Sequence, residues 1–173
     1  NAVEDFMRAE RIVIGAFDAA DADRVAAVYR GLVGEIILID PLAAELTKYG
    51  ANAFLAMRLT FANALSNLAE ELGADVLPIL EAIGLDRRIG PNFLRPGPGY
   101  GGSCFPKDTS ALLRIADDAG YEFGMLRSVI ETDGLQRERI VAKCVDLLGG
   151  DIVGKRIALW GLAFKAGTDD TRE

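Results

Sequence analysis

Residues 43–72 read AAELTKYGANAFLAMRLTFANALSNLAEEL, with no proline and a single glycine. Apolar side chains recur there at steps of three and four residues, which is the spacing of one helix face. The positions are Leu46, Tyr49, Ala53, Met57, Phe61, Leu65, Leu68 and Leu72. The pattern predicts one long amphipathic helix, ~45 Å in length at 1.5 Å per residue. A helix this long needs partner helices, from this chain or a second copy, to bury its stripe.

The flanking sequence predicts two kinds of structure. Further helices are expected at 75–83, 109–119 and 125–148. Apolar runs predict strands at 11–16, 35–40 and 155–161, and residues 21–32 predict a helix with Val25, Val28, Tyr29 and Leu32 on one face. A strand–helix–strand order indicates a parallel pair. The fold class is therefore mainly α, a helical central core around the long helix, with partial α/β (Rossmann-like) pieces at both ends.

Composition narrows the possible partners. Half of the 173 residues are hydrophobic, which is ample for a core, and the net charge is −7. An acidic balance argues against a nucleic-acid partner and against anionic lipid. No apolar run is long enough to span a bilayer, and two cysteines do not make a disulfide framework. We therefore expect no nucleic acid, no membrane and a reducing, cytoplasmic location.

The absence of histidine limits the chemistry. It excludes histidine triads, histidine-ligated zinc and histidine bases. The two cysteines, Cys104 and Cys144, lie far apart in the chain, so no metal site is expected. Any acid–base catalysis must come from Asp, Glu, Lys, Tyr or Cys.

A glycine-rich stretch holds the candidate nucleophile. Residues 95–108 read RPGPGYGGSCFPKD, in which glycines allow a close approach to a ligand and prolines stiffen the path. Cys104 stands near the start of the next helix with Lys107 and Asp108 just after it, a setting that suits a reactive thiolate. The alternative is a tight turn with an incidental small cysteine. The density of Gly, Pro, Cys, Lys and Asp favours a functional loop.

The segment GGSCFPKD resembles the catalytic-cysteine signature of the UDP-glucose/GDP-mannose dehydrogenase family. The resemblance implies enzymes that oxidise the C6 alcohol of a nucleotide sugar to a carboxylate with two NAD. Three other segments resemble the family in the same order: ELTKYGANAF its lysine/asparagine helix, IGLDRRIGPNFL the loop after its central helical segment, and IALWGLAFKAGTDDTRE the opening of its C-terminal domain. The likeness covers nearly the whole chain.

The resemblance also implies a domain plan. Residues 1–40 would end an N-terminal NAD-binding domain, residues 41–150 would form the central helical dimerisation and catalytic-cysteine domain, and residues 151–173 would begin a C-terminal nucleotide-sugar-binding domain. No G-x-G-x-x-G motif follows a strand. We therefore expect the chain to be the middle of a longer enzyme, inactive alone, that forms a homodimer through the central helix.

Catalytic roles follow from the resemblance. Cys104 would form a thiohemiacetal and then a thioester, and Asp108 would handle protons with the lysine and a water. Lys48 would stabilise an oxyanion and Asn52 would hold that oxygen or the water. Spacing alone places Lys48 and Asn52 on one helix face, where a solvated edge is the commoner explanation, and Asp108 could simply be a charge at a helix N-terminus.

Substrate contacts are implied in the same way. Arg88, matched through RIG, would reach the sugar bound by the neighbouring subunit. Residues expected to line the nucleotide-sugar site are Phe93, Leu94, Arg95, Tyr100 and Gly101. Lys165 would approach the substrate from the C-terminal domain, and Lys107 is predicted to contact the cofactor.

Three alternatives stay open at this point. The glycine-rich stretch is closer to the family's UDP-glucose enzymes than to its GDP-mannose enzymes, although most base-reading contacts lie outside the chain. The chain could serve only as a non-catalytic dimerisation core. A thiol hydrolase is disfavoured because the sequence has no histidine.

Overall fold

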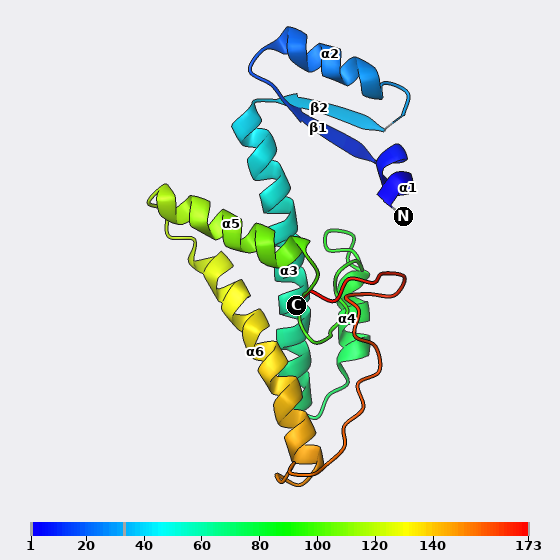
Figure 1. The fold of residues 1–173 in the computed structure, drawn as a ribbon, viewed down its shortest axis with the longest axis vertical. Helices are drawn as coiled ribbons and strands as arrows, with labels where there is room; N and C mark the ends of the chain where they lie inside the picture. The colour runs from blue at the N-terminus through cyan, green and yellow to red at the C-terminus, as the bar shows by residue number, and fades with distance from the viewer. Residues whose placement is uncertain (1, 33, 173) are drawn as a thin grey trace. The chain divides into compact units, whose positions relative to one another are not determined.

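The structure, a computed structural model, describes residues 2–32 and 34–172 (Figure 1). The chain divides into two compact units, one up to Gly50 and one from Ala51 onward. The first unit contains α1 (Ala2–Met7), β1 (Arg11–Gly15), α2 (Ala19–Tyr29) and β2 (Glu35–Ile39). Strands β1 and β2 pair in parallel, from Arg11 opposite Glu35 to Gly15 opposite Ile39. The predicted strand–helix–strand unit is confirmed.

Helix α2 buries a different face from the one expected. Its buried residues are Ala22 and Ala26, whereas Val25 and Val28 are exposed. Leu32 lies beyond the end of the helix and is also exposed. Val25, Val28 and Tyr29 do lie on one side of α2, as predicted, but that side is not the buried one. Small alanines let the helix backbone approach β1, which it contacts, more closely than branched side chains would.

Helix α3 (Pro41–Glu71) is the long helix expected from residues 43–72. Proline suits the first helical position, and the Asp40 carboxylate accepts from the Ala43 N–H at 2.9 Å. At the other end Gly73 has a φ of +70°, and the Ala74 N–H donates to the Ala69 carbonyl at 2.8 Å. Such a turn through a left-handed glycine satisfies the last carbonyls and ends the helix.

Small and polar residues form the buried face of α3, and Ala53 is the residue of the predicted stripe among them. The buried residues are Asn52, Ala53, Ala56, Thr60, Ala62, Asn63 and Ala69. Of the predicted stripe, Phe61, Leu68 and Leu72 are more than half exposed in one chain, so their burial against a second copy stays a prediction. On this face Ala56 packs against Tyr100 of the glycine-rich loop and Val129 of α6.

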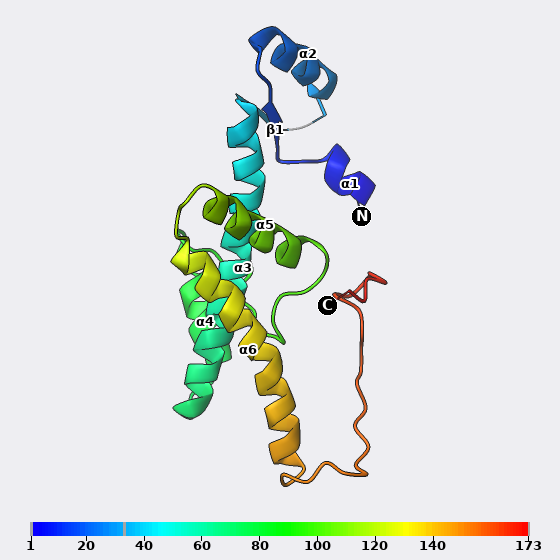
Figure 2. The same cartoon turned by 60° about the vertical axis from the view of Figure 1, so that its left-hand side comes forward.

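The second unit is completed by α4 (Val76–Gly84), α5 (Cys104–Asp118) and α6 (Gly124–Leu147). Helix α6 runs beside the second half of α3 in both ribbon views (Figure 1, Figure 2). The two helices point the same way, since Asn67 contacts Gln136 and Glu70 contacts Arg139 further along. The core of this unit forms where Ala56 of α3 and Val129 of α6 pack with buried residues of the glycine-rich loop.

Two elements of the second unit differ most from the sequence predictions. Helix α5 begins at Cys104 instead of residue 109, so the cysteine is its first residue. In the described part of the C-terminal segment, residues 151–172, the strand predicted at 155–161 does not form. A strand needs a neighbour for its N–H and C=O groups, and this segment lies next to none. No described helix is both long enough and apolar enough to cross a membrane.

Candidate active site

Side chains from α3 and α6 bind the backbone of the glycine-rich loop. The Gly97 N–H donates to Asn63 Oδ1 at 2.7 Å, and Gln136 Nε2 donates to the Gly97 carbonyl at 2.9 Å. The Tyr100 N–H donates to Asp133 Oδ1 at 2.8 Å. The sequence analysis missed Asn63, Asp133 and Gln136. Each is a polar residue on the buried face of a helix. The sequence alone could not identify them, because the buried faces of α3 and α6 were not known.

Gly99 is required by its conformation. Its φ is +114°, and a Cβ built on it would lie 3.1 Å from Asp133 Oδ1. A side chain there would meet both backbone strain and the carboxylate that binds the next residue. The glycine-rich loop is therefore fixed in one path over α6.

Replacing Gly99 by alanine is expected to lower the free energy of unfolding by about 1–3 kcal/mol, because it adds strain and displaces Asp133. The matched control is Gly124→Ala, at the start of α6, where an added Cβ would meet nothing within 4 Å. That change is expected to be neutral or stabilising. Urea unfolding followed by circular dichroism measures the stability of both variants. An unchanged unfolding midpoint for Gly99→Ala would contradict the requirement for glycine at this position.

Cys104 presents its thiol to solvent at the N-terminus of α5. Its Sγ atom lies 3.8 Å from Ser103 Oγ. Asp108 follows one helical turn later, so the thiol and the carboxylate share one face of α5. The other cysteine, Cys144, is half-buried on α6.

Asp108 brings three predicted residues together. Its side chain is 2% exposed. Asn52 Nδ2 donates to Asp108 Oδ2 at 2.5 Å, and Lys107 forms an ion pair with the other carboxylate oxygen. A buried carboxylate with a cationic partner and an amide donor can accept a proton from a nearby water. Lys48, one turn before Asn52 on α3, is an exposed residue of the first unit.

Three of the predicted substrate-site residues line one pocket. Phe93, Tyr100 and Gly101 border a cavity of about 430 Å³ together with Phe105 and Phe164. Phe105 packs edge-on against Phe93 and against Tyr100, each with ring centroids 6.1 Å apart. An aromatic cavity of this kind suits the apolar face of a ring-shaped ligand.

The remaining predicted contacts lie outside that cavity. Leu94 is buried, whereas Arg95 is exposed. Lys165 lies beside the cavity, with its Nζ 5.7 Å from the centre of the Phe164 ring. Arg88 is exposed and binds Asp86 through two nitrogens, which lowers the pKa of the Asp86 carboxyl.

A second cavity, of about 800 Å³, opens beside α5 and α6. Lys107, Arg137 and Arg172 line it, with Tyr100 at its wall. The Asp170 carboxylate raises the pKa of Arg172, and Cys104 adds a smaller effect in the same direction. Three cations around one cavity can hold an anionic group.

Arg58 is another residue that the sequence analysis missed. From α3 it donates to the carbonyls of Ile89 and Gly90, both at 2.7 Å, and so fixes the loop that follows α4.

Among the described residues no cluster of three or more acidic or cysteine side chains could hold a metal ion.

Comparison with known proteins identifies the family of this chain. The central domain of the UDP-glucose/GDP-mannose dehydrogenase family matches residues 42–134. The chain is 44% identical over its full length to UDP-glucose 6-dehydrogenase YwqF of Bacillus subtilis, and it covers 39% of that protein. It is 45% identical to a UDP-glucose 6-dehydrogenase of Rickettsia bellii, and it covers 40% of that protein. A solved UDP-glucose dehydrogenase from Pyrobaculum islandicum superposes on 99% of this chain with a TM-score of 0.87 and 41% identity, and the chain covers 40% of it. The chain thus spans about two fifths of the length of these relatives. It belongs to the UDP-glucose/GDP-mannose dehydrogenase family.

Proposed function

We propose that this chain supplies the central core and the catalytic cysteine of an NAD-dependent UDP-glucose 6-dehydrogenase, the longer parent enzyme. The observation that carries the proposal is the exposed thiol of Cys104, one turn before the buried Asp108 carboxylate that accepts from Asn52 and Lys107. The identity to UDP-glucose 6-dehydrogenases supports the choice of substrate.

The residues of this chain do not fit the pyrophosphate of NAD. The turn from β1 to α2 contains no glycine beyond Gly15, and the Asp18 carboxylate accepts from the Ala20 N–H at 2.7 Å. A carboxylate at that helix N-terminus would repel a phosphate. NAD would therefore have to bind other parts of the parent enzyme, and the predicted cofactor contact of Lys107 stays a prediction.

Cys104 would hold the sugar covalently between the two oxidations. The thiolate sulfur bonds to the C6 aldehyde carbon, and the carbonyl oxygen becomes the oxygen of a thiohemiacetal. Oxidation of this carbon to a thioester removes a hydride from the carbon and a proton from its oxygen, and the hydride would go to NAD held by other parts of the parent enzyme. Water then adds to the thioester and the carbon–sulfur bond breaks. The products are the carboxylate and the free thiol, and Asp108 would accept the proton of the attacking water. Lys48 would stabilise the oxyanion, as the family resemblance implies.

An NADH assay tests the proposed function. The parent enzyme is expected to reduce NAD with UDP-glucose, and the 173-residue chain is expected to show no activity because it lacks a pyrophosphate loop. GDP-mannose runs in parallel as the competing substrate. NADH formation by the 173-residue chain alone would disprove the account of NAD binding. If the parent enzyme forms no NADH with either sugar nucleotide, the proposed dehydrogenase function is disproved.

Exposed apolar residues on α3 support a dimer. Phe54, Phe61 and Leu68 are each more than half exposed, although α3 is the long helix of the core. A second copy of this chain would cover them in a two-fold interface. The contact of Arg88 with the partner's substrate stays a prediction, and it would require the exposed Arg88 side chain to leave Asp86.

Phe61→Glu is expected to shift the chain from dimer to monomer at micromolar concentration, because a charge would be buried in the interface. Sedimentation velocity measures the change. Leu147→Glu, at the exposed end of α6, is the control and should remain dimeric. A monomeric unmodified chain would contradict the proposed interface.

A further inference from the structure

Asp133 is a buried carboxylate that the mechanism above does not use. Its side chain has no solvent exposure. Oδ1 accepts from the Tyr100 N–H at 2.8 Å, and Oδ2 pairs with the Arg137 guanidinium at 3.0 Å. Burying a charge is costly unless it is fully hydrogen-bonded. Here one carboxylate oxygen accepts from a single backbone group of the glycine-rich loop, the Tyr100 N–H.

Tyr100 connects Asp133 to the residue beside Cys104. Its ring is buried in the core with Ala56 and Val129, and it packs edge-on against the ring of Phe105 at an interplanar angle of 82°. Phe105 directly follows Cys104 in the first turn of α5. A shift of the backbone at Tyr100 would therefore move the residue next to the nucleophile.

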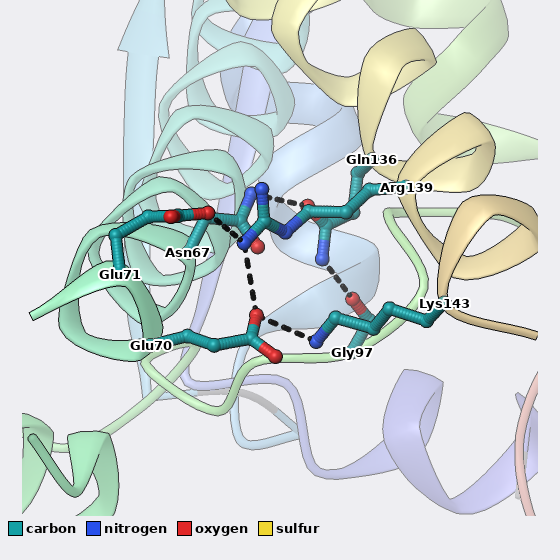
Figure 3. Close-up of polar contacts among 7 residues, drawn as sticks. All are labelled: Asn67, Glu70, Glu71, Gly97, Gln136, Arg139 and Lys143. Carbon is teal, nitrogen blue, oxygen red and sulfur yellow. Dashed lines mark hydrogen bonds and ion pairs between the residues drawn. The ribbon is translucent and has the colours of Figure 1, made fainter. Parts of the chain in front are cut away.

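A polar network joins α6 to α3 about two to three turns beyond Asp133 (Figure 3). Arg139 binds both Glu70 and Glu71, and Lys143 binds Glu70 at 2.7 Å. Lys143 and then Arg139 lower the pKa of the Glu70 carboxyl, which keeps it charged. These partly exposed ion pairs connect α6 to the end of α3.

A separate pair of contacts links Gln136 to α3 and to the loop. In Figure 3 its amide lies between α3 and the glycine-rich loop, where Asn67 Nδ2 donates to Gln136 Oε1 at 2.8 Å and orients the Nε2 donor toward the Gly97 carbonyl. Gln136 and Asp133, one turn apart on α6, thus bind the loop at Gly97 and at Tyr100. The loop has two anchors on a single rigid helix.

We propose that Asp133 is a positioning residue for Cys104, acting through the backbone of Tyr100 and the Tyr100–Phe105 ring contact. The proposal rests on the proposed role of Cys104 as the nucleophile. A misplacement of about 1 Å at a reacting atom can cost about 100-fold in rate, so a contact that only sets the loop path can control turnover.

The test compares Asp133→Ala and Asp133→Asn in the parent enzyme. Asparagine keeps an acceptor for the Tyr100 N–H, whereas alanine removes it. The matched control is Asp117→Asn, which removes an exposed carboxylate paired with Arg127. The measurements are kcat and KM for UDP-glucose, the rate of Cys104 alkylation by iodoacetamide without substrate, and the melting temperature. All rates are taken at a temperature where circular dichroism shows every variant folded.

Asp133→Ala is expected to lower kcat by about 100-fold and to change KM by less than about threefold. Asp133→Asn is expected to recover about tenfold of that loss, and Asp117→Asn to behave as the unmodified enzyme. If the alanine variant does not fold, Gly99→Ala decides in its place, because its added Cβ would displace the same carboxylate.

A lower melting temperature with kcat within about twofold of the unmodified enzyme would overturn the proposal, and so would a higher KM at unchanged kcat. If the unmodified parent shows no turnover, the proposed function fails and alkylation decides alone. The proposal then predicts a change of about fivefold or more in the alkylation rate for Asp133→Ala and none for Asp117→Asn. Equal alkylation rates would overturn it.

Discussion

Replacing Cys104 by serine is expected to lower carboxylate formation from UDP-glucose in the parent enzyme by at least ~10³-fold. Serine is a far weaker nucleophile than a thiolate when no adjacent base activates it, and the chain contains no histidine. The first oxidation, which needs no thiol, should survive in part. Product analysis of UDP-glucuronate beside NADH formation measures the two steps separately.

Cys144→Ser is the matched control for that experiment. Cys144 is half-buried on α6, so the change removes a thiol of the same protein without touching the α5 N-terminus. Its turnover should equal that of the unmodified enzyme. Normal UDP-glucuronate output from Cys104→Ser would disprove covalent catalysis at this residue.

Asp108→Asn is expected to lower turnover by about 10²–10⁴-fold, the usual range for loss of a general acid–base group. The amide keeps the shape of the carboxylate and can still accept from Asn52, but it cannot take a proton from water. The thioester on Cys104 should therefore accumulate, and intact-protein mass spectrometry would detect the added sugar nucleotide.

The control is Asp118→Asn, at the exposed C-terminal end of the same helix, where the carboxylate pairs with Arg114. It should neither slow turnover nor trap an adduct. If Asp108→Asn is slow but carries no adduct, Asp108 acts before the thioester forms. If it keeps full activity, Asp108 has no part in the chemistry.

Local sequence patterns predicted most of the helices and both strands of the first unit. Residues 43–72 contain no proline, and the observed helix α3, Pro41–Glu71, lies within two residues of the predicted ends. The predicted strand at 155–161 failed, because a strand is stabilised by hydrogen bonds to a neighbour that its own residues cannot provide. Boundaries and faces were less accurate than the existence of the elements.

Burial was the weakest part of the sequence-based prediction. Helical periodicity marks apolar residues, and it selected Phe61 and Leu68 of α3, which are exposed in one chain. The face that packs within the chain carries Ala56, Thr60 and Asn63. Close approach of helices favours small side chains and matched polar groups, and neither depends on hydrophobic spacing alone.

The sequence by itself determined the nucleophile candidate, its neighbours Lys107 and Asp108, and the family to which they point, because these residues are adjacent and their chemistry depends on residue type and spacing. Only the tertiary structure placed Asn52, 56 positions before Asp108, against that carboxylate, and Asp133 and Gln136 against the glycine-rich loop. Those contacts join α3, α5 and α6 across long stretches of chain. The contacts of Asp133 and Gln136 satisfy backbone groups of the loop, and that of Asn52 satisfies a buried carboxylate. Polar groups away from water must be hydrogen-bonded, and which side chain meets that need depends on how the helices pack.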